Sequence, residues 1–121
     1  MQTIKNQHGE IIDVTLHEAD RDDCLVIIGH GVTGDKDRPL VIAVAEALQN
    51  HGYPTVRISF SGNGNSGGTF EDSTVSKEVD DLTAVLHQIG HGKKIANIGQ
   101  SMGGAVGALT AARDDRLKTL V

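Results

Sequence analysis

The sequence has few aromatic residues and no excess of positive charge. Its 121 residues include no tryptophan, one tyrosine and two phenylalanines, and the formal net charge is −5. A nucleic-acid-binding protein normally presents a basic face together with aromatic side chains for stacking. The one basic doublet, Lys93-Lys94, fits a solvated turn better than a binding patch. The composition therefore argues against a nucleic acid as the partner.

Cysteines, signal sequences and long apolar runs are equally scarce. The single cysteine, Cys24, cannot form a disulfide within the chain, which fits a reducing compartment. It opens the apolar run CLVIIG, where a small buried side chain is expected rather than a reactive thiol. The opening segment MQTIKNQHGE lacks the apolar core of a signal peptide, and no run approaches the length that spans a membrane. We predict a cytoplasmic protein that has no membrane partner.

What the chain does contain is a regular alternation of strand and helix signals. Residues 4–16, with a turn at His8-Gly9, predict a hairpin. Further strands are expected at residues 25–28, 55–60, 94–98 and 117–121, and helices at residues 39–51, 75–89 and 102–112. Asp37 is a plausible cap for the first helix, with Pro39 in its first turn. The apolar stripe of that helix is formed by Leu40, Val41, Val44, Ala47 and Leu48.

This alternation predicts an α/β fold with a mostly parallel sheet and helices on both faces. A chain of 121 residues is long enough for one small domain and too short for two. Ligands in such sheets bind beyond the carboxyl ends of the strands. The loops that begin at Gly29, Ser59 and Gly99 are therefore the candidate functional site.

Residues 57–70, RISFSGNGNSGGTF, contain a possible phosphate-binding motif. Gly62, Gly64 and Gly67 spell G-x-G-x-x-G, which binds a dinucleotide when it joins a strand directly to a helix. Here several residues separate Gly67 from any helix, and the acidic residues at about the expected distance lie inside a predicted helix. We therefore predict a tightly turning glycine loop that binds no nucleotide cofactor. The histidines lack the spacing of metal ligands, so no metal is predicted either.

Two G-x-S-x-G motifs compete for the role of a catalytic serine. A nucleophile elbow requires a strand, a sharp turn at the serine and a helix that starts at once. Ser66 lies several residues after its strand and well before its helix, whereas Ser101 follows KKIANI directly and is followed at once by MGGAVGALTAAR. The glycines of that helix cost about 1 kcal/mol each relative to alanine, so they indicate close packing against the sheet. We assign Ser101 as the nucleophile; the alternative is a glycine-rich turn with an incidental serine.

An acyl-transfer site also needs two fixed donors for the oxyanion. These are typically the N–H after the nucleophile and an N–H from the loop after a neighbouring strand. Met102 and Val32 are the candidates, and both would act through the backbone. Four histidines precede a glycine, but only His30 follows a buried strand. We expect His30 to organise the loop rather than to act as a base.

Taken together, HGVTGDKD, RISFSGNGNSGG, EVDDL and GQSMGG resemble the α/β-hydrolases, in particular the cinnamoyl- and feruloyl-esterase-like and serine-aminopeptidase-like branch. The resemblance covers about residues 25–121, with the motifs in the family's order and spacing. It implies the α/β-hydrolase fold and an acyl-enzyme on Ser101, without a metal or cofactor. Family members often have Asp at the position of Ser59 and His at that of Asn63, and both positions are usually structural.

The resemblance also implies a triad that runs from serine to acid to histidine along the chain. No histidine follows Ser101, and the only acidic residues after it are Asp114 and Asp115. We therefore expect residues 1–121 to be the N-terminal part of a single α/β-hydrolase domain, truncated in or just after the sixth strand. On their own they are expected to be inactive.

The predicted function of the complete protein is hydrolysis of a small-molecule acyl substrate, most simply a carboxylic ester. The alternative is a non-catalytic protein that keeps the fold as an interaction module. A strained serine favours the enzyme, because a scaffold does not need one, and the missing histidine favours the module. Ester, thioester, amide and lactone all remain open, as does the oligomeric state.

Overall fold

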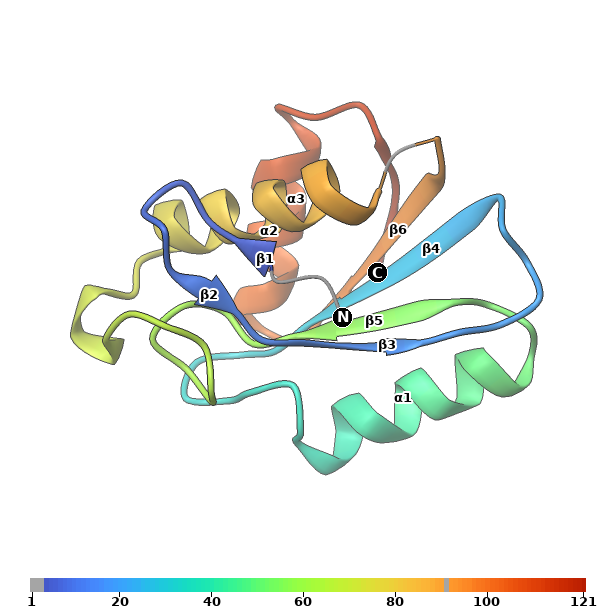
Figure 1. The fold of residues 1–121 in the computed structure, drawn as a ribbon, viewed down its shortest axis with the longest axis horizontal. Helices are drawn as coiled ribbons and strands as arrows, with labels where there is room; N and C mark the ends of the chain where they lie inside the picture. Colours follow the sequence, from blue (N-terminus) through green and yellow to red (C-terminus); the bar gives the residue numbers. More distant parts are fainter. Residues whose placement is uncertain (1–3, 91) are drawn as a thin grey trace.

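A computed structural model describes residues 4–90 and 92–121 of the chain (Figure 1). Strands β1 (Ile4–Lys5) and β2 (Ile11–Ile12) form a small antiparallel hairpin. The main sheet contains β3 (Val14–His17), β4 (Cys24–Gly29), β5 (Thr55–Ile58), β6 (Lys94–Gly99) and β7 (Leu117–Leu120). Its strand order is β3-β5-β4-β6-β7, and only the pair β3-β5 is antiparallel. The predicted mostly parallel sheet is confirmed.

Helices cover both faces of this sheet, as predicted (Figure 1). Helix α1 (Pro39–Asn50) lies on one face, and α2 (Val75–Ile89) and α3 (Met102–Ala111) pack together on the other. The Thr74 hydroxyl caps α2 by accepting the N–H of Lys77 at 3.1 Å. Gly52, with φ of +88°, follows the end of α1 in the left-handed conformation that ends many helices.

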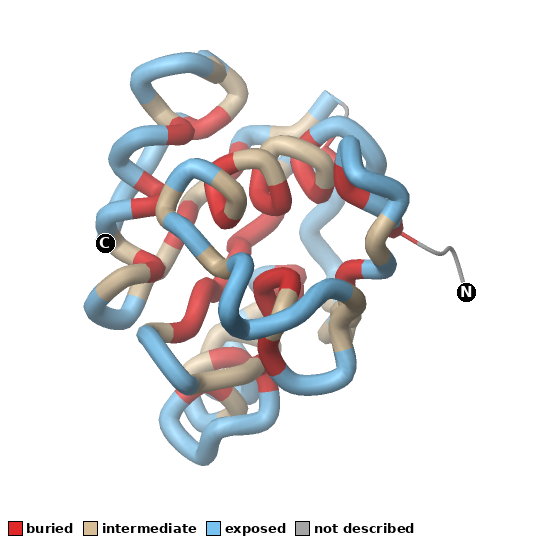
Figure 2. The backbone as a smooth tube through the Cα atoms, turned by 90° about the vertical axis from the view of Figure 1, so that its left-hand side faces the viewer, coloured by how far each residue is buried: buried red, intermediate tan, exposed pale blue. Residues whose placement is uncertain are grey.

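The core has two parts because β4 is buried on both faces. Neighbouring side chains of a strand point to opposite sides. Ile27 accordingly packs in the larger cluster beneath α2 and α3, whereas Ile28 packs with Val41 and Ala45 of α1. Figure 2 shows the buried segments gathered in the middle of the molecule. This two-sided burial explains the unbroken apolar run CLVIIG.

Three local predictions were wrong. Residues 14–16 do not continue the hairpin, because β3 pairs with β5 of the main sheet instead. Asp37 does not cap α1; Arg38 occupies the cap position, and the Asp37 carboxylate pairs with Arg57 at 2.9 Å. Leu40 and Ala47 are not part of the buried stripe, since 56% of Leu40 is exposed and Ala47 is exposed as well.

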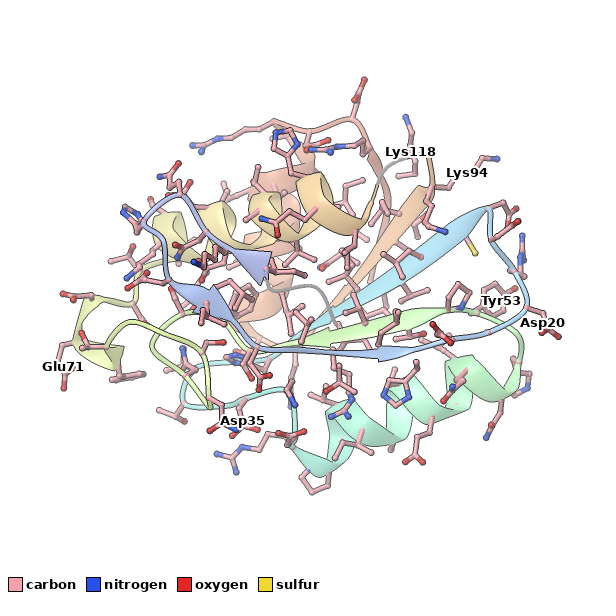
Figure 3. The ribbon with its side chains drawn as sticks, in the orientation of Figure 1. Asp20, Asp35, Tyr53, Glu71, Lys94 and Lys118 are labelled. Atoms are coloured by element: carbon pink, nitrogen blue, oxygen red, sulfur yellow. The ribbon has the colours of Figure 1, made fainter. Side chains whose placement is uncertain are left out.

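The carboxyl ends of β4, β5 and β6 meet at one edge of the sheet, because these strands are parallel. Asp35, in the loop between β4 and α1, marks this edge in Figure 3. Tyr53 and Lys94, which lie at the starts of β5 and β6, mark the opposite edge. The loops after β4, β5 and β6 therefore converge, as the sequence predicts.

Candidate active site

Ser101 lies at a strained turn between β6 and α3. Its φ is 55° and its ψ is −111°, and Thr33 is the one other non-glycine residue with a positive φ in the described part of the chain. Such a conformation costs about 1–3 kcal/mol and persists only where the surroundings enforce it. Ser101 is exposed, and its Oγ makes no hydrogen bond within the described residues. The geometry matches the strand–turn–helix arrangement of a nucleophile elbow.

The glycines around Ser101 let the turn pack against the sheet. A Cβ on Gly103 would lie 2.6 Å from the carbonyl oxygen of Gly29. A Cβ on Gly99 would overlap the backbone of Gly103, and one on Gly107 would overlap the Asn97 side chain. A Cβ on Gly104, by contrast, would only touch the Gly99 oxygen at 3.5 Å. Close packing therefore explains three of the glycines but does not explain Gly104.

The loop after β4 runs beside the Ser101 turn. Gly29 pairs with Gly99 in the sheet, and the Gln100 N–H donates to the Gly29 oxygen at 3.0 Å. A Cβ on Gly31 would lie 3.3 Å from the Cβ of Ser101, so the two loops are in close contact. This places the segment that carries Val32 next to the nucleophile turn.

The two predicted oxyanion donors both have free N–H groups. Among residues 4–90 and 92–121, no acceptor is bound to the backbone N–H of Val32 or of Met102. A pocket of about 460 Å³ opens beside Val32 and Ser101. Its lining residues are Gly31, Val32, Gly34, Arg38, Pro39, Leu40, Gln100 and Ser101. The volume falls within the range of roughly 300–1,000 Å³ that is usual for small-molecule sites.

His30 is buried, and both of its ring nitrogens are occupied. Nε2 accepts the Phe60 N–H at 3.0 Å, so Nδ1 carries the proton and donates to the Gly31 oxygen at 2.7 Å. Burial lowers the pKa of His30, and the hydrogen bond to Gly31 only partly opposes this effect. A neutral imidazole with both nitrogens engaged cannot take a proton from Ser101. The position of His30 agrees with its predicted role as an organiser of the loop.

Ser66, the competing serine, is tied into the backbone. Its hydroxyl donates to the Ser59 oxygen at 2.6 Å and accepts the Asp13 N–H at 2.8 Å. The surrounding glycine loop is closed by backbone bonds from Gly62 to Gly67 and from Gly67 to Ile11. The 3₁₀ helix η1 (Phe70–Asp72) lies between this loop and α2, so the loop does not lead directly into a helix. A cofactor loop would need that direct junction.

A network of charged side chains, which sequence reasoning missed, holds the loop after β4. The Arg57 guanidinium donates to the Lys36 oxygen at 2.7 Å and to Asp37 at 2.9 Å. The Lys36 ammonium lies 3.4 Å from Asp13, and the backbone N–H of Lys36 donates to the Ser59 hydroxyl at 2.9 Å. Burial opposes ionisation of Asp37, but the bonds from Arg57 and Lys36 outweigh it and lower its pKa.

A second unforeseen cluster joins α2 to the loop after β5. Asp81 is fully buried and accepts the Ser61 N–H at 2.7 Å and the Asn6 side-chain amide at 2.9 Å. Glu78, one turn earlier on α2, is buried with no partner for Oε1 among the described residues. Burial, reinforced by the charge of Asp81, raises the pKa of Glu78 from 4.5 to about 7. The motif EVDDL was the only sequence signal for this cluster.

Two absences among the described residues bear on other kinds of site. None of the helices in residues 4–90 and 92–121 combines the length and the apolar character needed to cross a membrane. Within the same residues, no three His, Cys, Asp or Glu side chains gather where they could hold a metal ion. His91 lies outside the described residues.

Comparisons with known proteins identify a family. The family described as serine aminopeptidase, S33, matches residues 20–121. The mitochondrial palmitoyl-protein thioesterase ABHD10 of Bos taurus is 29% identical over 79 residues, which are 65% of this chain and 26% of that protein. Est1E from Butyrivibrio proteoclasticus, solved with ferulic acid bound, is 31% identical with a TM-score of 0.86, over 98% of this chain and 50% of Est1E.

DcsB, solved with a substrate analogue, is 27% identical with a TM-score of 0.89, over 98% of this chain and 43% of DcsB. The chain thus spans half the length of these solved relatives or less, and about a quarter of the bovine thioesterase. The chain therefore belongs to the serine aminopeptidase (S33) family of α/β-hydrolases.

Proposed function

We propose that this chain carries the nucleophile and the oxyanion hole of a carboxylic-ester hydrolase. The observation that supports the proposal best is Ser101 at φ of 55°, which lines the same pocket as Val32. The backbone N–H groups of Val32 and of Met102, the residue after Ser101, are both unpaired among the described residues. Ser101 Oγ attacks the acyl carbon, and the two N–H groups stabilise the negative charge that develops on the carbonyl oxygen. The alcohol then leaves with a proton, and water releases the acid from the acyl-enzyme.

In this proposal, the general base and the acid of the triad come from outside residues 1–121. A serine hydroxyl is a weak nucleophile at neutral pH without a base to take its proton. Because His30 is fully engaged, we propose that both groups lie in segments equivalent to the unmatched half of the relatives. The 121 residues alone are then inactive. The test is the DNA that follows the codon for Val121: a reading frame that continues to an aspartate and a histidine would support this proposal.

The choice of an ester rests on the relatives. Est1E was solved with ferulic acid, a carboxylic acid, bound, and the bovine relative is named a thioesterase. We propose an oxygen ester as the substrate and keep a small-molecule acyl partner and a cytoplasmic location as parts of the same proposal. A non-catalytic interaction module is the competing outcome of the test below.

The test is covalent labelling of the longest natural protein that contains this chain. A fluorophosphonate probe should label the wild type, and Ser101→Ala should abolish the labelling. Ser66→Ala is the matched control, because Ser66 belongs to the other G-x-S-x-G motif. Its hydroxyl is hydrogen-bonded to the backbone of Ser59 and Asp13. Labelling that is lost only in Ser66→Ala would reverse the assignment. A folded wild type that is never labelled would favour the interaction module.

A further inference from the structure

Arg38 is the one charged residue among those that line the pocket beside Ser101. Its guanidinium donates to the Thr33 oxygen at 2.9 Å, which holds the positive charge next to the segment that carries the Val32 N–H. An arginine side chain has five N–H donors in a planar fork. The bond to Thr33 leaves most of them available to a ligand.

The acidic residues near Arg38 do not neutralise it. Asp37 is engaged by Arg57 at 2.9 Å and by Lys36 at 3.2 Å. Asp35 accepts the Asp37 N–H at 2.8 Å and is not paired with Arg38. Within residues 4–90 and 92–121, Arg38 forms no ion pair. In a chain whose net charge is −5, the pocket thus keeps an unpaired positive charge.

The rest of the pocket suits the uncharged part of an acyl substrate. Val32 is 57% exposed and Leu40 56% exposed, and both line the pocket together with Pro39. Together these three side chains give the pocket an apolar wall. One guanidinium on such a wall can select a substrate by its charge, since planar bidentate binding of carboxylates is characteristic of arginine.

We propose that Arg38 is a specificity-determining residue that binds an anionic substituent of the substrate. The substrate class is then an ester that carries a carboxylate or similar anion on its acyl part or on its leaving group. This inference rests on the proposed function, since it assumes that the pocket beside Ser101 receives the ester. It adds a contact to the substrate that neither Ser101 nor the oxyanion donors provide.

The test compares matched esters in the longest natural protein that contains the chain. The first pair is p-nitrophenyl hydrogen glutarate and p-nitrophenyl pentanoate, which differ in an acyl carboxylate. The second pair is p-acetoxybenzoate and phenyl acetate, which differ in a carboxylate on the leaving group. The measured quantity is the ratio of kcat/KM within each pair, so that a general loss of activity cancels.

In Arg38→Gln the ratio should fall about tenfold for at least one pair, as expected for a partly exposed charge-assisted bond. Arg38→Lys should restore part of the ratio, because it keeps the charge but loses the planar fork. Arg113→Gln, which removes an exposed arginine beyond the far end of α3, is the matched control and should leave both ratios unchanged. The pair that responds identifies the side of the ester that carries the anion. Unchanged ratios for both pairs in Arg38→Gln, or equal losses on both members of each pair, would overturn the proposal.

A binding measurement separates this inference from the proposed function. Monomethyl glutarate is titrated by calorimetry into the Ser101→Ala protein with and without Arg38→Gln. Binding that weakens about tenfold without the guanidinium supports the anion site even if no labelling of Ser101 is seen. Binding that is absent, or equal in the two proteins, overturns the anion site even if Ser101 is labelled.

Discussion

Replacing Gly103 by alanine tests how closely the Ser101 turn must pack on the sheet. The added Cβ would lie 2.6 Å from the Gly29 oxygen, and ordinary contact begins at 3.4 Å, so α3 would have to move by about 0.8 Å. The neighbouring residue is Met102, whose N–H is a proposed oxyanion donor. A misplacement of about 1 Å can cost about 10²-fold in rate. Overpacking of this kind also destabilises by about 1–3 kcal/mol.

The assay is the rate of fluorophosphonate labelling, measured together with thermal unfolding of the same samples. Gly104→Ala is the control, because its Cβ would meet the Gly99 oxygen only at 3.5 Å. Alanine at that helical position should leave the labelling rate near the wild type and should stabilise by about 0.5–1 kcal/mol. If the two variants were labelled and unfolded alike, the packing argument for the serine turn would be refuted.

Two further predictions concern single side chains. Val32→Pro removes a proposed oxyanion N–H and should lower kcat by about 10²- to 10³-fold, whereas Val32→Ala should lower kcat far less. Near-UV circular dichroism must show that both variants are folded. Equally small effects of the two changes on kcat would exclude Val32 from the site. Because the folded-state pKa of Glu78 is raised from 4.5 to about 7, its contribution favours the folded state below pH 4.5 and is lost as the pH rises through 7. Glu78→Gln should therefore flatten the fall in melting temperature between pH 4.5 and 7, whereas Gln in place of the exposed Glu46 should not. Parallel curves of melting temperature against pH for the wild type and Glu78→Gln would contradict the argument that burial of Glu78 raises its pKa.

The sequence predicted those parts of the site that depend on neighbours in the chain. The Ser101 turn was recognisable because a strand, a serine between spaced glycines and a helix occur within a few residues. The contact between its loop and the loop of Val32 followed from the rule that parallel strands end at one edge of the sheet. Both inferences needed no knowledge of a distant side chain.

The parts that were missed depend on contacts across the fold. Asp37 fits the local rule for a helix cap, yet its carboxylate forms an ion pair with Arg57, twenty positions away in the chain, and does not cap the helix. The strand of residues 14–17 pairs with β5, and Asp13, just before it, is bound by Ser59 and Ser66, which follow β5 in the chain. Periodicity placed Leu40 in the core, but it cannot report that this side chain lines the pocket beside Ser101 instead. Such outcomes are decided by pairing energies between segments that sequence patterns treat separately.

The contact of Gly103 with the Gly29 oxygen and the overlap that a Cβ on Gly99 would cause involve backbone atoms alone. The position of the nucleophile is thus set by the main chain and does not depend on the side chains that line the neighbouring pocket. Arg38, Leu40 and Val32 are exposed at that pocket, so their side chains can be exchanged without moving Ser101. In engineering terms, the serine turn is a fixed frame and these three positions are the variable ones. A combinatorial library restricted to them would explore substrate preference while the glycines keep the reactive geometry constant.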